Sequence, residues 1–347
     1  MLPEERHATK PRRTKSWARL AAGMATGLTL LIAAALLYCV AMPGDSFTGP
    51  APRPSAAEQQ VATELRAHVS ALAVEIGQRR ATFGDSLQRA EQYITGELGS
   101  LAVAGALRRE PLAGAPGNPA NVVLELPGTR AGPIVLLGAH YDTDQGGTPG
   151  ANDNGSGVAT ALVLAKRLSA AKHALPIRIV LFANEEQPYF ATSAMGSLQH
   201  AQGCRKRGEQ LRAMLSLETM GYYSDEPRSQ KYPAPLSALY PDRGNFIGFV
   251  ANLGSRGLLR DVMGRFRQHA TIPSEGAALP EALPGVGWSD HWAFWREGYE
   301  AIMVTDTALF RDPTYHRHSD IAPNLDYERL ARVAVGLERV VLELASE

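Results

Sequence analysis

The sequence has few cysteines, no excess of either charge and no internal repeat. Only two cysteines, Cys39 and Cys204, occur in the 347 residues. Cys39 lies in a long apolar stretch, so we expect neither an internal disulfide nor a metal bound by cysteine. Lys and Arg together number 35, as do Asp and Glu. A protein that binds nucleic acid needs a basic face to neutralise phosphates, so the charge balance argues against that class.

Overall composition and length are ordinary for a folded enzyme. Hydrophobic residues make up 45% of the chain and charged residues 20%, both close to the averages of globular proteins. The length suffices for one large α/β domain with appendages, or for two small domains.

Charge is absent from one stretch near the N-terminus, which runs from Leu20 to Met42. Its length matches the roughly 20 residues that cross a hydrocarbon core as a helix. Basic residues precede it, namely Arg6, Lys10, Arg12, Arg13, Lys15 and Arg19. A basic flank stays in the cytoplasm. The pattern therefore predicts a single-pass membrane anchor, with the rest of the chain in the periplasm or outside the cell.

A cleaved signal peptide, a buried core helix or a lipid-attachment site at Cys39 could also account for this apolar stretch. The apolar core of a cleaved signal spans about 7 to 15 residues and ends in small residues. Here the stretch is longer, Ala41-Met42-Pro43 is a poor cleavage site, and Leu37 and Tyr38 are too large before a lipidated cysteine. The anchor is favoured, and whether it is later cleaved stays open.

The chain divides into four predicted parts. Residues 1–19 form a basic cytoplasmic tail and residues 20–42 the transmembrane anchor. Residues 43–56 are rich in Pro, Gly, Ser and Ala, a composition typical of a semi-extended linker. Residues 57–347 form the catalytic domain.

Within residues 57–347, helical and buried-strand patterns alternate. Apolar residues recur at helical spacing from Ala57 and again over Ser86–Leu98, 155–168 and Tyr327–Leu344. Short apolar runs predict strands at 121–126, 133–138, 177–182, 214–217 and 301–305. Strands that alternate with helices indicate a three-layer α/β/α sandwich around a mixed, mostly parallel sheet.

Polar residues follow the predicted strands at the points where active sites collect in such sheets. They are His140 and Asp142, Asp153 in a glycine-rich loop, Glu185 and Glu186, Glu218, and Tyr315 with His316. The glycine-rich loop could instead bind a phosphate, but neither a Walker lysine nor dinucleotide-type glycine spacing accompanies it. Two imidazoles and three carboxylates suit a pair of divalent cations, and zinc accepts both ligand types. Manganese and cobalt fit the same ligands.

Six motifs together resemble one family, the co-catalytic zinc aminopeptidases of the bacterial leucyl aminopeptidase and aminopeptidase Y type. Glutaminyl cyclases and glutamate carboxypeptidases are its relatives. The motifs are Gly138-Ala-His-Tyr-Asp142, Gly150-Ala-Asn-Asp-Asn-Gly155, Asn184-Glu-Glu186, Leu217-Glu-Thr-Met-Gly221, Ser289-Asp-His291 and Tyr315-His316. The resemblance spans residues 57–347 and implies a metallopeptidase of zinc-peptidase fold with two zinc ions.

Carried over residue by residue, the resemblance implies a role for each candidate. His140 and Glu218 would bind one zinc, Glu186 and His316 the other, and Asp153 would bridge both. Glu185 would be the general base for a hydroxide held by the two zinc ions. Asp142 would orient His140, and Tyr315 would polarise the scissile carbonyl.

This sequence departs from the family at one ligand position, because Glu218 stands where the family usually has Asp. The longer side chain reaches a metal if the backbone lies about 1 Å further away, so Glu218 stays a candidate ligand. Ser289-Asp290-His291 would buttress the site without binding metal. His318 competes with His316, which the preceding tyrosine favours.

The resulting functional hypothesis is an aminopeptidase that acts on peptides or proteins. Alternatives are a glutaminyl cyclase, a carboxypeptidase-like or dipeptidase-like relative, and a binding domain that has lost catalysis. Segments 187–196 and 222–245 are candidates for facing the substrate. Side-chain preference, natural substrate and oligomeric state stay open.

Overall fold

The computed structural model describes residues 14–101 and 106–346 and divides the chain into two units, Met1–Ala41 and Met42–Glu347. The described part of the first unit is one helix, α1 (Thr14–Val40). Its stretch Ala21–Val40 is long and apolar enough to cross a membrane, a property that signal sequences share. Most of the predicted basic tail, residues 1–13, lies outside the described residues.

The proline-rich segment at the start of the second unit lies along the folded domain. Arg267 donates hydrogen bonds to the backbone carbonyls of Pro43 and Gly44, and Arg332 donates to that of Pro52. Helix α2 (Ala56–Ser70) follows, with a capping box between Ser55 and Glu58 at its start. A π-helical turn, Ala71–Ile76, continues it.

The second unit is built on one sheet, which has eight strands within the described residues, in the order β1-β2-β4-β3-β5-β8-β6-β7. The strands are β1 (Leu107–Pro111), β2 (Ala120–Leu126), β3 (Ile134–His140), β4 (Ile177–Phe182), β5 (Leu211–Glu218), β6 (Ile247–Asn252), β7 (Ser274–Leu279) and β8 (Ile302–Thr305). Pairings β3–β4, β3–β5, β5–β8 and β6–β7 are parallel, whereas β1–β2, β2–β4 and β6–β8 are antiparallel. The predicted mixed, mostly parallel sheet is confirmed.

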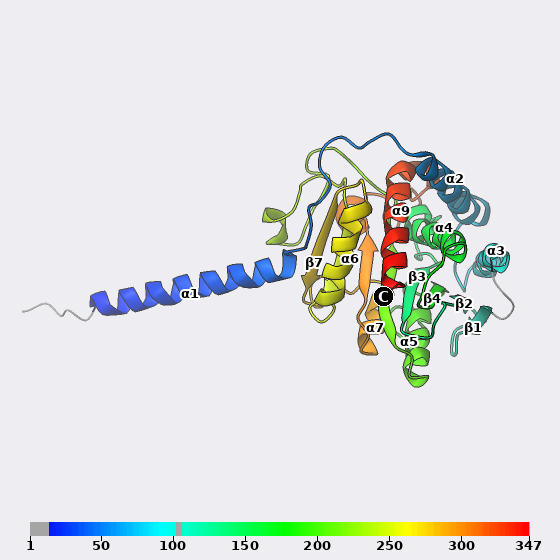
Figure 1. Ribbon diagram of the computed structural model, residues 1–347, viewed down its shortest axis with the longest axis horizontal. Coiled ribbons are helices and arrows are strands. Elements are labelled where there is room, and N and C mark those ends of the chain that lie inside the picture. The colour runs from blue at the N-terminus through cyan, green and yellow to red at the C-terminus, as the bar shows by residue number, and fades with distance from the viewer. Residues whose placement is uncertain (1–13, 102–105, 347) are drawn as a thin grey trace, which may run out of the picture. The chain divides into compact units, whose positions relative to one another are not determined.

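Helices cover both faces of the sheet. On one face α2, α4 (Gly157–Ser169), α6 (Arg256–His269) and α9 (Tyr327–Leu344) pack side by side (Figure 1), and α3 (Ser86–Gly99) packs against α4 and β2. On the other face, the ring of Phe182 contacts His200 of α5 (Gly196–Lys206) and Phe294 of α7 (His291–Arg296). A short helix, α8 (Ala308–Arg311), lies before the last loop. The three-layer α/β/α prediction is therefore confirmed.

Candidate metal centre

The carboxyl ends of three neighbouring strands bring the predicted side chains to one edge of the sheet. His140 is the last residue of β3, and Glu218 is the last residue of β5. Glu185 and Glu186 follow β4 by a few residues. Because β3 is parallel to both β4 and β5, these strands end at the same edge. Asp153 reaches it from the loop that precedes α4.

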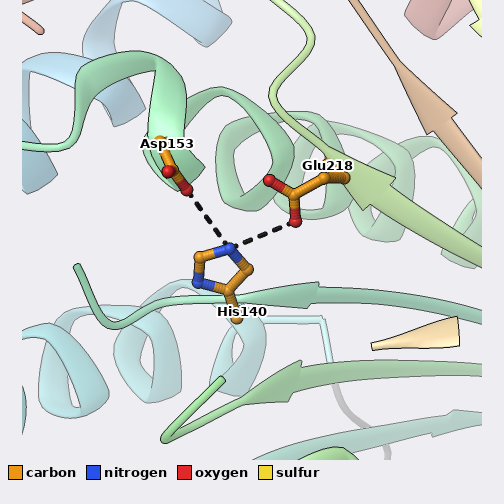
Figure 2. Close-up of side chains that lie close together, drawn as sticks. All are labelled: His140, Asp153 and Glu218. Carbon is orange, nitrogen blue, oxygen red and sulfur yellow. Dashed lines mark ion pairs between the residues drawn. The ribbon is translucent and has the colours of Figure 1, made fainter. Parts of the chain in front are cut away.

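His140 is the centre of a first cluster of side chains. Its Nε2 lies 3.3 Å from Oδ1 of Asp153 and 3.2 Å from Oε2 of Glu218. Figure 2 shows that both carboxylates point at this one nitrogen. All three side chains are buried. One imidazole and two carboxylates at this spacing form a potential metal site.

His316 is the centre of a second cluster, on the other side of Asp153. Its Nε2 lies 3.0 Å from Oδ2 of Asp153 and 3.6 Å from Oε1 of Glu186. Asp153 thus directs one carboxylate oxygen toward each histidine. This arrangement suits a carboxylate that bridges two ions.

Two further predicted residues, Asp142 and Glu185, lie beside the first cluster. The carboxylate of Asp142 accepts hydrogen bonds from the backbone N–H of Glu185 at 3.1 Å and of Glu186 at 3.0 Å. Its Oδ1 lies 3.5 Å from Nδ1 of His140. Asp142 thereby ties the β4 loop to the β3 histidine. The carboxylate of Glu185 lies 3.9 Å from Nε2 of His140, and the described residues offer it no hydrogen bond.

The remaining predicted residues separate into those near the clusters and those away from them. The ring of Tyr315 stacks on His316, with centroids 3.9 Å apart. His318 is exposed and contacts the carbonyl of Gly147 instead. His291 is buried against the carbonyl of Val286, and burial lowers its pKa to about 4. Ser289 donates to Oε2 of Glu218 at 2.7 Å, so the Ser289–His291 segment supports the first cluster.

The electrostatics of the clusters favour a bound cation. Burial raises the pKa values of Glu185, Glu186 and Glu218, and neighbouring carboxylates raise them further. Burial acts the same way on Asp153, but His140 and His316 outweigh it and lower the pKa of that carboxyl. The buried atoms Oδ2 of Asp153 and Oε1 of Glu186 have no hydrogen-bond partner among the residues that the structure describes. Divalent cations would neutralise this excess of negative charge and coordinate these oxygens, so the residues fit two metal ions.

One acidic residue at the second cluster has no counterpart among the predicted ones. Oδ2 of Asp144 lies 3.7 Å from Nδ1 of His316, the ring nitrogen that faces away from Asp153. This position suits a residue that orients the imidazole. The alternation of Asp142 and Asp144 after β3 was its only signal in the sequence.

Arg79 and Asp320 hold the loop that carries Asp153. Asp320 accepts hydrogen bonds from the backbone N–H of Asn152 and of Asp153. Arg79 is buried, and its guanidinium donates to the backbone carbonyls of Leu72, Gly77, Tyr141, Pro149 and Gly150. A lone arginine in a loop has no recognisable pattern, so sequence reasoning missed it.

Comparison with known proteins places this site in a family. The profile described as peptidase family M28 matches residues 121–341. The chain belongs to peptidase family M28. This confirms the resemblance inferred from the motifs and the prediction of a zinc-dependent hydrolase.

Relatives of this M28 chain include bacterial and fungal proteins. The uncharacterized protein YfbL of Escherichia coli is 34% identical over 82% of this chain and 88% of its own length. A probable leucine aminopeptidase of Arthroderma otae is 28% identical, and the match covers 62% of this chain but only 55% of that protein. This M28 chain thus spans about half the length of the fungal relatives.

Solved structures share the fold of this M28 chain. LapB from Legionella pneumophila has a TM-score of 0.68 at 19% identity, covering 88% of this chain and 79% of its own. A glutaminyl cyclase from Tannerella forsythia has a TM-score of 0.60 at 20% identity, and the match covers 81% of this chain and 98% of the cyclase. A zinc aminopeptidase from Bacillus subtilis has a TM-score of 0.61 at 16% identity, and the match covers 82% of this chain and 95% of that aminopeptidase. The fold is therefore common to peptidases and cyclases.

Proposed function

We propose that this protein is an aminopeptidase that uses two zinc ions. His140 and Glu218 would hold one ion, Glu186 and His316 the other, and Asp153 both. The observation that carries the proposal is the placement of Asp153, whose two oxygens lie 3.3 Å from His140 and 3.0 Å from His316. Bound zinc would supply Lewis-acid polarisation of a carbonyl and acidify a water molecule.

Glu185 is the proposed general base. Its carboxylate lies beside the first cluster, makes no hydrogen bond with the described residues and is left over from the two ligand sets. Burial raises the pKa of its carboxyl well above the usual value, and a raised pKa makes a carboxylate a stronger proton acceptor. Asp142 fixes its backbone. Glu185 would take a proton from water and deliver it to the leaving amine.

Tyr315 is the proposed donor to the carbonyl oxygen. Burial and the nearby carboxylates raise the pKa of its phenol well above the usual value, so the hydroxyl keeps its proton and can donate. Stacking on His316 restricts the ring. A hydrogen bond aimed at the developing oxyanion would stabilise the transition state.

A free N-terminus is the substrate group that this site suits best. Several carboxylates surround the two clusters, and any negative charge that the metal ions leave uncompensated would attract an ammonium group. Fungal relatives are described as leucine aminopeptidases or probable leucine aminopeptidases, which supports the same choice.

Hydrolysis of matched peptides with free and acetylated N-termini tests the proposal, using the zinc-loaded full-length chain in detergent. Only free peptides should be cleaved. Glu185→Gln should bind two zinc ions and lose activity by at least about 10³-fold, whereas the exposed control Glu226→Gln should be unaffected. Cleavage of neither peptide would overturn the aminopeptidase proposal. Formation of a cyclic product from N-terminal glutamine would indicate a glutaminyl cyclase instead.

We also propose that α1 is the predicted anchor, with its N-terminus in the cytoplasm and the enzyme unit in the periplasm or outside the cell. The apolar stretch Ala21–Val40 supports the span, and the basic residues before it support the orientation. Protease added to the outside of cells whose cytoplasmic membrane is intact should digest the enzyme unit. An N-terminal tag should be spared, because the membrane would protect it. Digestion of the tag instead would reverse the topology.

A further inference from the structure

An apolar pocket opens beside the metal centre. Its cavity volume is about 120 Å³, and Glu218 and Tyr315 form part of its wall. Its apolar lining includes Leu236, Phe246, Leu279, Leu283, Leu309 and Phe310. None of the described residues that line it is a lysine or an arginine. Besides Glu218, the one charged residue among them is Glu275.

A row of residues across the sheet connects the metal centre to Glu275. Glu218 of β5 is in register with Thr305 of β8, Thr305 with Gly248 of β6, and Gly248 with Glu275 of β7. Residues in register point to the same face of a sheet, and neighbouring strands lie about 4.8 Å apart, so the two glutamates stand roughly 14 Å apart at their Cα atoms.

Gly248 lies in the middle of this row and lines the pocket. It has no side chain, and a Cβ there would lie 3.1 Å from the carbonyl oxygen of Thr305 and 3.2 Å from Cγ2 of Thr307. Both threonines line the pocket. A side chain larger than that of glycine would therefore crowd the pocket wall at this position, between the metal centre and Glu275.

The carboxylate of Glu275 has no partner in the described part of the protein. It is half-buried, and burial raises its pKa although Arg267 opposes the shift. The guanidinium of Arg267 instead donates to Ser274, on the opposite face of β7, and to the carbonyls of Pro43 and Gly44. A carboxylate left in an apolar wall is unfavourable unless a cation or a donor arrives.

Two tyrosines give the same region a second means of attracting a cation. The rings of Tyr232 and Tyr240 stack with centroids 5.7 Å apart, and both line the pocket. Their hydroxyls donate to the carbonyls of Pro241 and Gly276. The hydroxyls are thus engaged, while aromatic faces attract ammonium and guanidinium groups.

We propose that Glu275 is a specificity-determining residue that selects peptides with an N-terminal lysine or arginine. With the N-terminal residue at the metal centre, a lysine side chain extends about 6 Å from its Cα by standard bond lengths. It would pass over Gly248 and pair its ammonium group with Glu275. A leucine side chain stops short of that carboxylate. This inference rests on the proposed aminopeptidase function.

Peptides that differ only at the first residue test the inference, with the zinc-loaded full-length chain as enzyme. Wild-type kcat/KM should favour lysine over norleucine by about tenfold or more, since norleucine has the same four-carbon chain without the ammonium. Glu275→Gln should remove that preference and leave norleucine cleavage within about twofold. Glu275→Lys should disfavour lysine below norleucine.

A matched control and a binding measurement separate this inference from the proposed function. Glu281, whose carboxylate pairs with Asn252 and Arg296, lies outside the pocket, so Glu281→Gln should keep the wild-type lysine preference. Binding of lysine hydroxamate and norleucine hydroxamate, measured by calorimetry, reports on the pocket even if no peptide is cleaved. Equal binding or cleavage of the two ligands by the wild type, or an unchanged ratio in Glu275→Gln, would overturn the role of Glu275.

Discussion

The two halves of the candidate metal centre share Asp153 but are built differently. In the first half, His140 and Glu218 each end a buried strand, and their side chains are 1% and 10% exposed. In the second half, His316 lies on a loop with a positive φ of 57°, and its side chain is 34% exposed. The first half is part of the core, whereas the second is completed by the last loop of the chain.

This contrast predicts where metal exchange should occur. A ligand at a strand end is held by the hydrogen bonds of the sheet and by core packing, while an exposed loop opens locally at lower free energy. Water and chelators reach the second half more easily. We therefore expect one ion to be held firmly and the other to be held loosely.

The largest effect is expected at the residue that both halves share. Asp153→Ala should remove both metal ions and reduce hydrolysis by more than about 10³-fold, because each histidine cluster loses a carboxylate. Zinc per protein after dialysis is the measurement, with the exposed Asp45→Ala as control. If Asp153→Ala retained two zinc ions, the two halves would not share a bridge.

A smaller effect should separate the two halves. Graded chelation of the wild type should release one zinc quickly and the other slowly. His316→Ala should lack the fast phase and keep one firmly bound ion. Its affinity for the second ion should fall at least about 100-fold, more than the usual 10–100-fold loss when a residue that only hydrogen-bonds to a ligand is changed. His140→Ala should instead abolish the slow phase. Equal release rates from both sites in the wild type would contradict the comparison.

The smallest effect should come from the one ligand that departs from the family. Glu218→Asp shortens a side chain whose Oε2 lies 3.2 Å from His140 and accepts a hydrogen bond from Ser289. We expect the ion at the first half, the one released slowly, to bind about tenfold more weakly, because the strand end is positioned for the longer carboxylate. The ion at the second half should bind as in the wild type. Zinc titration of the metal-depleted variant measures it. Tighter binding would mean that the first half tolerates the family's usual residue better than its own.

The central strands and their attached ligands could be predicted because the sequence signal there is strong. The runs that became β3, β4 and β5 are mainly apolar, so each strand end was visible and the polar residue after it stood out. The motifs around His140, Asp153 and Glu186 then agreed with the family pattern.

Strands β6 and β7, at one edge of the sheet, were not predicted, for identifiable reasons. The β7 segment, Ser274–Leu279, consists largely of small residues, and β6 includes Gly248. The β7 segment therefore lacks the apolar run of a buried strand, and its packing in the folded protein makes it a strand. Without β6 and β7 the row of residues from Glu218 to Glu275 could not be recognised, so the sequence did not indicate a role for Glu275. The tyrosines beside it do lie in segment 222–245, which was expected to face the substrate.

The buried guanidinium of Arg79 bears on how this enzyme can be divided. It donates to carbonyls on both the β3 side and the Asp153 loop, yet it lies outside residues 121–341, the part that matches the family profile. A fragment trimmed to those residues would keep every proposed ligand and lose the donor that closes the loop around them. The catalytic unit is therefore larger than its recognisable motifs. The N-terminal segment that carries Arg79 holds the loop of a proposed zinc ligand in place.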